Sequence, residues 1–262
     1  MYNFEFVKPS SIDEAVAALG EDEAQALGGG QTLIPTLKQR LARPARLVSL
    51  SGIAEMKGVG AEGGVLTIGG GTSHATVAAE AAGSYPALAA LAGNIGDPAV
   101  RNRGTIGGSL ANNDPSACYP AAALGSGATI VTNAREIAAD DFFKGMFTTA
   151  LEEGEIITAV RFPVPQAANY QKFEQPASRF ALVGVFVARG GDGVRVAVTG
   201  ASEEGVFRWS EAEAALASDF STGAIEGLSV PADGMIADLH GSKAYRAHLV
   251  GVLTRRAVSA AS

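Results

Sequence analysis

Three glycine-rich stretches carry the residue types and spacing best suited to binding a ligand. They lie at residues 28–32, 69–72 and 104–109. A glycine loop between a strand and a helix exposes several backbone N–H groups together with the N-terminus of the helix, which suits a diphosphate. One glycine triplet alone is equally typical of a tight turn that binds nothing. Three such loops in an acidic chain favour an anionic ligand held by backbone donors.

Side chains that could act as acids, bases or metal ligands are few and scattered. The candidate acids are Asp97, Asp114, Asp140 and Asp141. The first two precede proline, which is typical of turn caps. His74 either touches a ligand or simply begins a helix. The three histidines and the single cysteine, Cys118, have no metal-ligand spacing. We therefore predict no metal site, no internal disulfide and no iron–sulfur cluster on this chain.

The common nucleotide and hydrolase motifs are missing from the sequence. There is no GxxxxGK[ST] and no GxSxG, and Leu33 stands where a third glycine would complete GxGxxG after the first triplet. The usual P-loop, serine-hydrolase and dinucleotide-binding Rossmann sites are therefore excluded.

Composition bounds the class of protein. The chain has 262 residues, 47% of them hydrophobic and 18% charged, with a net charge of −7. This length suggests one or two domains with a sizeable core. The acidic balance and the lack of long runs of like charge argue against a nucleic-acid partner. No apolar stretch is long enough to cross a membrane and the first residues do not resemble a signal peptide, so we predict a cytoplasmic protein.

The elements that position these loops follow from hydrophobic periodicity. Ser11 begins a capping box, and the pattern after it predicts a helix that ends near Gly20. Strands are predicted over 24–27, 46–50, 65–68, 128–132 and 156–162, and helices over 33–41, 74–82, 85–92, 114–124, 210–217 and 243–254. Residues 93–109 are predicted to be an ordered loop without a regular element. The prolines at 163 and 165 mark a boundary, after which three strands are expected over 170–174, 180–189 and 194–199.

Two of the glycine stretches carry a resemblance to a known family. Residues 28–35, GGGQTLIP, resemble the first FAD loop in the flavin subunits of molybdenum hydroxylases, the group of xanthine dehydrogenase and carbon monoxide dehydrogenase. Residues 95–111, IGDPAVRNRGTIGGSLA, are similar to the second FAD loop of the same group and are the more specific match. Residues 170–172 and 179–183 resemble the start of its C-terminal domain.

The resemblance implies an α+β fold. It would comprise a two-subdomain FAD-binding fold of the vanillyl-alcohol oxidase (PCMH) type over residues 1–165, with subdomains at about 1–55 and 56–165. A smaller α+β C-terminal domain with a three-stranded antiparallel sheet would follow over residues 166–262.

The resemblance also implies cofactor contacts. Those to the FAD diphosphate would come from Gly28, Gly29, Gly30, Gln31 and Thr32. Those to a second segment of FAD would come from Thr105, Ile106, Gly107, Gly108 and Ser109. Ile157 and Lys172 are similar to further FAD-contacting positions, and Phe180 would lie near the flavin ring. Cys118 stands where the family usually has an aspartate that contacts the ribityl chain, so this contact departs from the pattern.

The function implied by the resemblance is that of an FAD-binding electron-transfer subunit in a heterotrimeric molybdenum hydroxylase. A large subunit would carry molybdopterin and a small one two [2Fe–2S] clusters, and the assembly would be a dimer of heterotrimers. FAD would pass electrons to NAD+, a quinone or dioxygen, with no catalytic acid or base needed from this chain. Two alternatives are a stand-alone flavin oxidase or reductase of the same superfamily and a non-redox scaffold.

Overall fold

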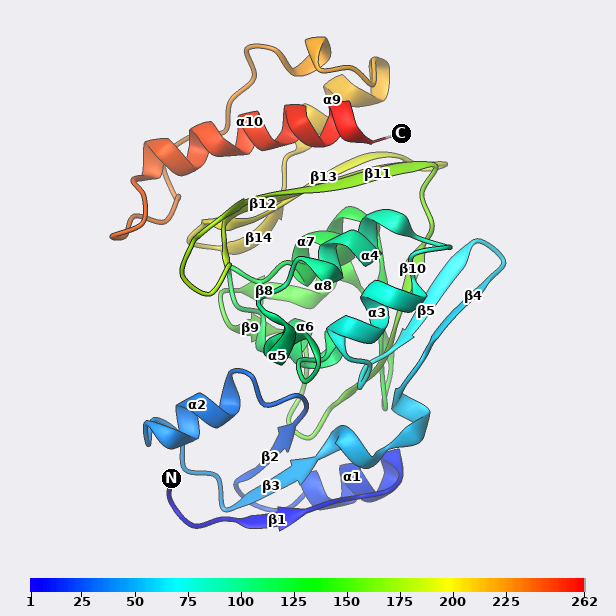
Figure 1. Cartoon of the computed structure of the whole chain (residues 1–262), viewed down its shortest axis with the longest axis vertical. Coiled ribbons are helices and arrows are strands. Elements are labelled where there is room, and N and C mark those ends of the chain that lie inside the picture. Colours follow the sequence, from blue (N-terminus) through cyan, green and yellow to red (C-terminus); the bar gives the residue numbers. More distant parts are fainter. Residues whose placement is uncertain (262) are drawn as a thin grey trace.

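The computed structural model describes residues 1–261, which form three units stacked along the long axis (Figure 1). The first unit, at the N-terminal end, contains a small sheet and two α-helices. A middle unit contains a five-stranded sheet with its helices, and a C-terminal unit contains a four-stranded sheet covered by the last long helix. None of the described helices is long and apolar enough to cross a membrane.

The first unit is a parallel three-stranded sheet with two helices. Its strands β1 (Glu5–Val7), β3 (Arg46–Ser49) and β2 (Ala24–Leu27) pair in that order. Helix α1 (Ile12–Leu19) follows β1, and helix α2 (Leu33–Lys38) follows the first glycine loop. The Ser11 side chain accepts a hydrogen bond from the Glu14 amide, so the predicted cap of α1 is confirmed.

The middle unit is built on an antiparallel sheet with the strand order β4-β5-β10-β6-β7. The strands are β4 (Val59–Glu62), β5 (Val65–Gly69), β10 (Ile157–Pro163), β6 (Thr129–Thr132) and β7 (Glu136–Ala138). Its helices are α3 (His74–Glu80), α4 (Pro86–Gly93), α5 (Pro98–Arg101), α6 (Ile106–Asn112), α7 (Tyr119–Gly125) and α8 (Ala139–Phe142), and β8 (Phe143–Gly145) pairs with β9 (Thr148–Thr149) as a separate hairpin.

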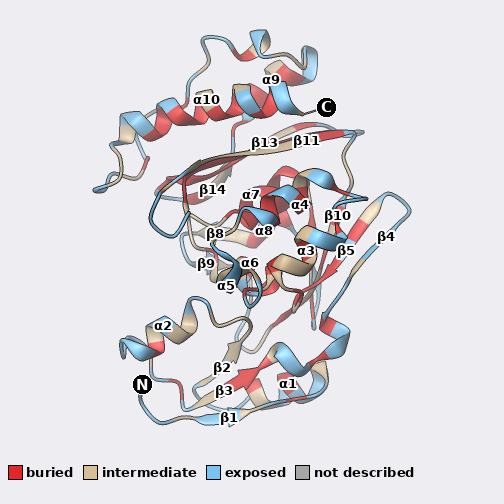
Figure 2. Cartoon of the chain, in the orientation of Figure 1, coloured by how far each residue is buried: buried red, intermediate tan, exposed pale blue. Residues whose placement is uncertain are grey.

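The C-terminal unit has a sheet that is buried on both faces. Its strands β11 (Ala167–Glu174), β12 (Ala181–Gly190), β13 (Gly193–Ser202) and β14 (Gly205–Arg208) form an antiparallel meander. Helix α7 packs on one face, and α9 (Ser210–Ser218) and α10 (Lys243–Ala260) cover the other. Residues 181–188 of β12 are consequently all buried (Figure 2). The three predicted strands are present, and β14 is a fourth that sequence patterning missed.

The prediction of an irregular loop over residues 93–109 is wrong, and the helix predicted over 114–124 begins only at Tyr119, as α7. Residues 93–109 contain the short helix α5 and the start of α6, where an irregular loop was expected. Asp97 caps α5 by accepting a hydrogen bond from the Val100 amide at 2.9 Å, and Thr105 caps α6 in the same way. The glycines of α6 hid the helix because glycine lowers helix propensity. They are tolerated because α6 packs closely against the backbone of Gly70.

Candidate functional site

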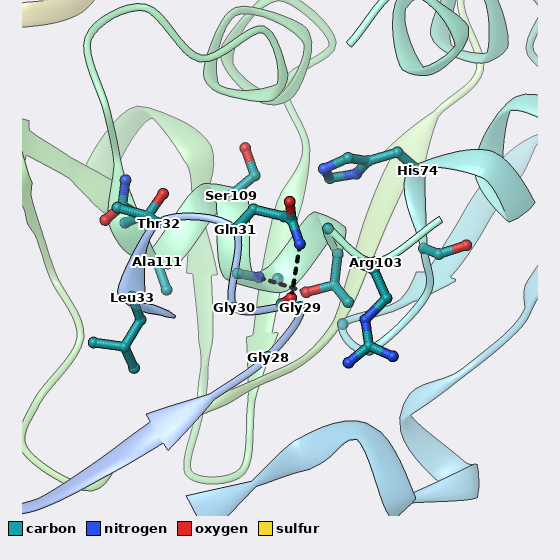
Figure 3. A pocket seen from close by; sticks show the side chains of 18 of the residues that line it. Gly28, Gly29, Gly30, Gln31, Thr32, Leu33, His74, Arg103, Ser109 and Ala111 are labelled. Atoms are coloured by element: carbon teal, nitrogen blue, oxygen red, sulfur yellow. Dashed lines mark hydrogen bonds between the residues drawn. The ribbon is translucent and has the colours of Figure 1, made fainter. Parts of the chain in front are cut away.

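A cleft of about 1270 Å³ lies between the first unit and the middle unit. Its walls include the first glycine loop, the start of α3, the α5–α6 segment and the end of the 178–180 loop that precedes β12. Figure 3 shows the part of it around the first glycine loop. The volume exceeds the 300–1,000 Å³ usual for small-molecule sites, so the cleft suits a long ligand.

The first glycine loop presents free backbone donors. None of the amides of residues 28–32 donates a hydrogen bond to another residue within the described part of the chain. Gly30 has a φ of +74°, a conformation that favours glycine. The Gln31 side chain folds back to donate to the Gly29 carbonyl at 3.2 Å (Figure 3). A set of unpaired amides at a turn attracts anions, as expected for this loop.

The first glycine loop also touches the second. A Cβ placed on Gly29 would come within 2.0 Å of the Arg103 carbonyl oxygen and 2.6 Å of the Gly104 Cα. A Cβ on Gly28 would meet the Thr105 hydroxyl at 3.1 Å. Real Cβ atoms do not approach backbone this closely, so Gly29 is needed for the two loops to meet across the cleft.

The second loop differs from the first because the amides of its residues 106–109 are already paired. At the start of α6, the Ile106 amide donates to the Thr72 carbonyl and the Gly107 amide to the Gly70 carbonyl at 2.9 Å. The Gly108 amide donates to the Thr105 hydroxyl at 3.1 Å. The first loop therefore supplies five consecutive free donors, while the second supplies mainly close packing, hydroxyl groups and shape.

The third glycine stretch holds the sheet to α6. A Cβ on Gly70 would lie 2.0 Å from the Ile157 carbonyl oxygen, and one on Gly107 would lie 2.6 Å from the Gly70 oxygen. Thr72 is buried and exchanges hydrogen bonds with the Gly58 backbone. Glycine at residues 70 and 107 allows β5, β10 and α6 to approach one another at the cleft floor.

Most of the predicted site residues line this cleft. They are Gly28, Gly29, Gly30, Gln31, Thr32, Thr105, Gly107, Gly108, Ser109, Cys118 and Ile157. Phe180 lines it as well. Ile106 does not, because it is fully buried in the core of the middle unit.

Lys172 also lies outside the lining. Its ammonium donates to the Asn94 carbonyl at 2.6 Å and to the Arg179 carbonyl at 2.9 Å. These carbonyls belong to two segments whose neighbours, Ile95 and Phe180, line the cleft. Lys172 therefore links the two segments through these hydrogen bonds.

Cys118 lies at the inner wall and is 6% exposed. Burial raises the pKa of its thiol, with the Lys172 charge and the Tyr170 hydroxyl as smaller opposing influences. The thiol is thus neutral at pH 7 and behaves as a small apolar group with weak hydrogen bonding.

The charged groups of the cleft are mostly cationic or already paired. Arg103 is exposed at the rim and has no ion-pair partner among residues 1–261. Sequence reasoning did not single it out, although it lies inside the 95–111 motif. Glu155 binds Arg135 through two hydrogen bonds, which together with the Glu152 amide and the Thr132 hydroxyl lower its pKa to about 2. It therefore stays ionised and serves as a structural anchor.

Three of the four candidate acids have structural roles, and the fourth, Asp141, is exposed and does not line the cleft. Asp97 caps α5, and Asp114 accepts a hydrogen bond from the Ser116 amide at 2.8 Å, as expected of a turn. Asp140 pairs with Arg195 and Arg208 away from the cleft. Within the described residues no group of histidine, cysteine, aspartate and glutamate side chains could hold a metal ion.

Comparison with known proteins agrees with this geometry. Residues 2–165 match the family described as "FAD binding domain in molybdopterin dehydrogenase". The chain belongs to this family. It is 34% identical to the carbon monoxide dehydrogenase medium chain of Afipia carboxidovorans, over 99% of this chain and 96% of that one. It is 33% identical to the nicotine 6-hydroxylase medium subunit of Paenarthrobacter nicotinovorans, over 97% and 95%.

Solved structures of the family share the whole architecture. Carbon monoxide dehydrogenase from Hydrogenophaga pseudoflava aligns with a TM-score of 0.88 at 33% identity, covering 99% of this chain and 97% of that one. Quinoline 2-oxidoreductase from Pseudomonas putida aligns with a TM-score of 0.88 at 30% identity, covering 98% and 96%. The fold is therefore the FAD-binding fold of the family, and the chain is a flavoprotein oxidoreductase subunit of the molybdenum-hydroxylase type.

The residues present fit FAD. The cleft is large enough for a dinucleotide, and the free backbone amides of residues 28–32 lie where two glycine loops touch. A diphosphate needs such donors, because the net charge of −7 provides no diffuse attraction for an anion. The hydroxyl-bearing residues Thr32 and Ser109 also line the cleft, one from each unit.

Proposed function

We propose that FAD extends through this cleft with its diphosphate against residues 28–32. Five unpaired amides and the absence of a Cβ at Gly29 are the observations that carry this assignment. Gly28, Gly29, Gly30, Gln31 and Thr32 would bind the diphosphate. Thr105, Gly107, Gly108, Ser109 and Ile157 would border a second segment of the cofactor, with the buried Ile106 supporting them from below.

The ring end of FAD would be bounded by Phe180, with Cys118 at the wall. Lys172 would act on this end by holding the 94–96 and 178–180 segments together through their carbonyls. Bound FAD supplies the redox chemistry, since it can exchange both single electrons and hydride equivalents. The chain's own part is to orient the cofactor and to limit its contact with water.

The chain would act as the medium subunit of a complex. Its relatives are named as medium chains, and it spans 96% of the length of the carbon monoxide dehydrogenase medium chain. The partners would be a large molybdopterin subunit and a small subunit with [2Fe–2S] clusters, assembled as a dimer of heterotrimers in the cytoplasm. The single cysteine of this chain supports clusters on another subunit, because such clusters need four protein ligands. Electrons would pass from those clusters through FAD to an external acceptor.

Coexpression with the partner subunits tests this function. The three chains should copurify, and substrate of the molybdenum subunit should bleach the flavin absorbance of the complex but not that of the isolated chain. Bleaching of the isolated chain by an organic substrate would favour a stand-alone enzyme. Full turnover by a complex that contains no flavin would instead favour a scaffold role for this chain.

A further inference from the structure

His74 stands at the wall of the cleft with no hydrogen-bond partner for its ring. The residue is 5% exposed, and its Nδ1 is buried without a partner. Nε2 makes no hydrogen bond within the described residues either, and it is not among the buried unpaired atoms, so it faces the cleft that His74 lines. Nε2 is therefore the ring nitrogen that a ligand in the cleft can reach, while Nδ1 stays enclosed by protein.

The orientation of the ring is fixed from two sides. The Nε2 edge lies against Gly104, where a Cβ would come within 2.5 Å of Nε2. The His74 amide donates to the Gly104 carbonyl at 3.0 Å, and the ring packs on Tyr119 with centroids 5.3 Å apart. Gly104 is also the residue whose Cα abuts Gly29. Nε2 therefore borders the place where the two glycine loops meet (Figure 3).

The protonation state of the ring follows from its surroundings. Burial, and to a smaller extent the charge of Arg101, lower the pKa of His74 from 6.5 to about 4. The neutral ring carries one N–H. A proton on Nδ1 would be buried without an acceptor, so the favourable tautomer carries it on Nε2, where the cleft is open.

We propose that His74 is a further FAD-binding residue, whose Nε2–H donates a hydrogen bond to the diphosphate beside Gly29. The proposal rests on the FAD site proposed above. It gives the diphosphate a neutral donor from the middle unit in addition to the amides of the first unit. The cofactor would then be held from both walls of the cleft at one point.

Titration of flavin-free protein with FAD tests this role. His74→Phe keeps a ring to pack on Tyr119 but has no donor, and it should weaken FAD binding by about tenfold or more, since hydrogen bonds to charged groups are strong. His74→Gln places an amide donor near the position of Nε2 and should stay within about threefold of wild type. Affinity for riboflavin, which has no diphosphate, should be the same in all three proteins. Wild-type affinity for FAD in a folded His74→Phe protein would overturn the proposal.

A second measurement does not depend on any variant folding. The chain has three histidines, so ¹⁵N-labelled histidine gives few signals to assign. The Nε2 resonance of His74 should be that of a protonated nitrogen and should shift on addition of FAD but not of riboflavin. An unshifted resonance with FAD bound would contradict a direct contact. Failure of the wild type to bind FAD at all would instead reject the proposed function.

Discussion

Gly29 and Arg103, 74 positions apart in the sequence, meet so closely that a Cβ on Gly29 would lie 2.0 Å from the Arg103 carbonyl oxygen. This contact joins the loop with five free amides to the loop whose amides at residues 106–109 are occupied. The cleft is consequently built from one loop that binds through its backbone and another that gives it shape. Predictions for single residues follow from this division.

Replacing Gly107 should disrupt the floor of the cleft. A Cβ there would be 2.6 Å from the Gly70 carbonyl oxygen and 3.1 Å from the Gly70 Cα, so Gly107→Val must push α6 away from β5. We expect loss of FAD and a stability lower by about 1–3 kcal/mol, typical of overpacking. Gly60→Val is the matched control, since a Cβ on Gly60 meets no atom within 4 Å. Full flavin content in a folded Gly107→Val protein would show that the second loop is not part of the FAD site.

Lys172→Met should act on FAD through the two segments that Lys172 joins. Without hydrogen bonds to the Asn94 and Arg179 carbonyls, residues 175–180 lose an anchor. Limited proteolysis should therefore cut this segment faster in the variant than in wild type, even without FAD. Equal cleavage rates of the flavin-free proteins, together with weaker FAD binding, would show that Lys172 contacts the cofactor directly.

His74 should make stability depend on pH between about 4 and 6.5. Its folded-state pKa of about 4 lies below the ordinary 6.5, so the unfolded chain binds the proton more readily. The stabilisation by the neutral ring is fully present above pH 6.5 and is lost as the pH falls towards 4. Between pH 8 and 5 this loss amounts to about 2 kcal/mol. Urea unfolding should show that wild type loses this much more than His74→Phe, and parallel pH curves would contradict it.

Cys118 should react slowly with thiol reagents. Its thiol is 6% exposed and burial raises its pKa, so little thiolate is present at pH 8. We expect modification by a disulfide reagent to be at least about tenfold slower in the folded protein than in urea. Rapid modification of the folded, flavin-free protein would place the thiol in open contact with solvent.

Sequence reasoning reached the main elements because their signals are local. The cap at Ser11, the strand before the first glycine loop and the apolar run of β12 are each visible within a few residues, and each is present. The helix α6 was missed because its stability comes from packing against Gly70, a contact distant in sequence. The strand β7, of three residues, is too brief for periodicity to indicate.

The loop motifs predicted which segments form the candidate site. They could not predict which loop presents free amides and which loop provides close packing. The pairing of the Ile106 and Gly107 amides depends on carbonyls more than thirty positions away. The destination of the Lys172 ammonium and the unpaired ring of His74 likewise depend on tertiary contacts. Residue type and spacing alone do not encode these relationships.

The flavin content of the assembled complex tests the central claim most directly. Acid precipitation of the wild-type complex should release one FAD per copy of this chain, with no flavin left on the polypeptide. The complex with Gly29→Ala, which places a methyl group against the Arg103 carbonyl, should keep its subunit composition and contain little or no FAD. A Gly29→Ala complex with the full flavin content of wild type would contradict the assignment of FAD to this cleft.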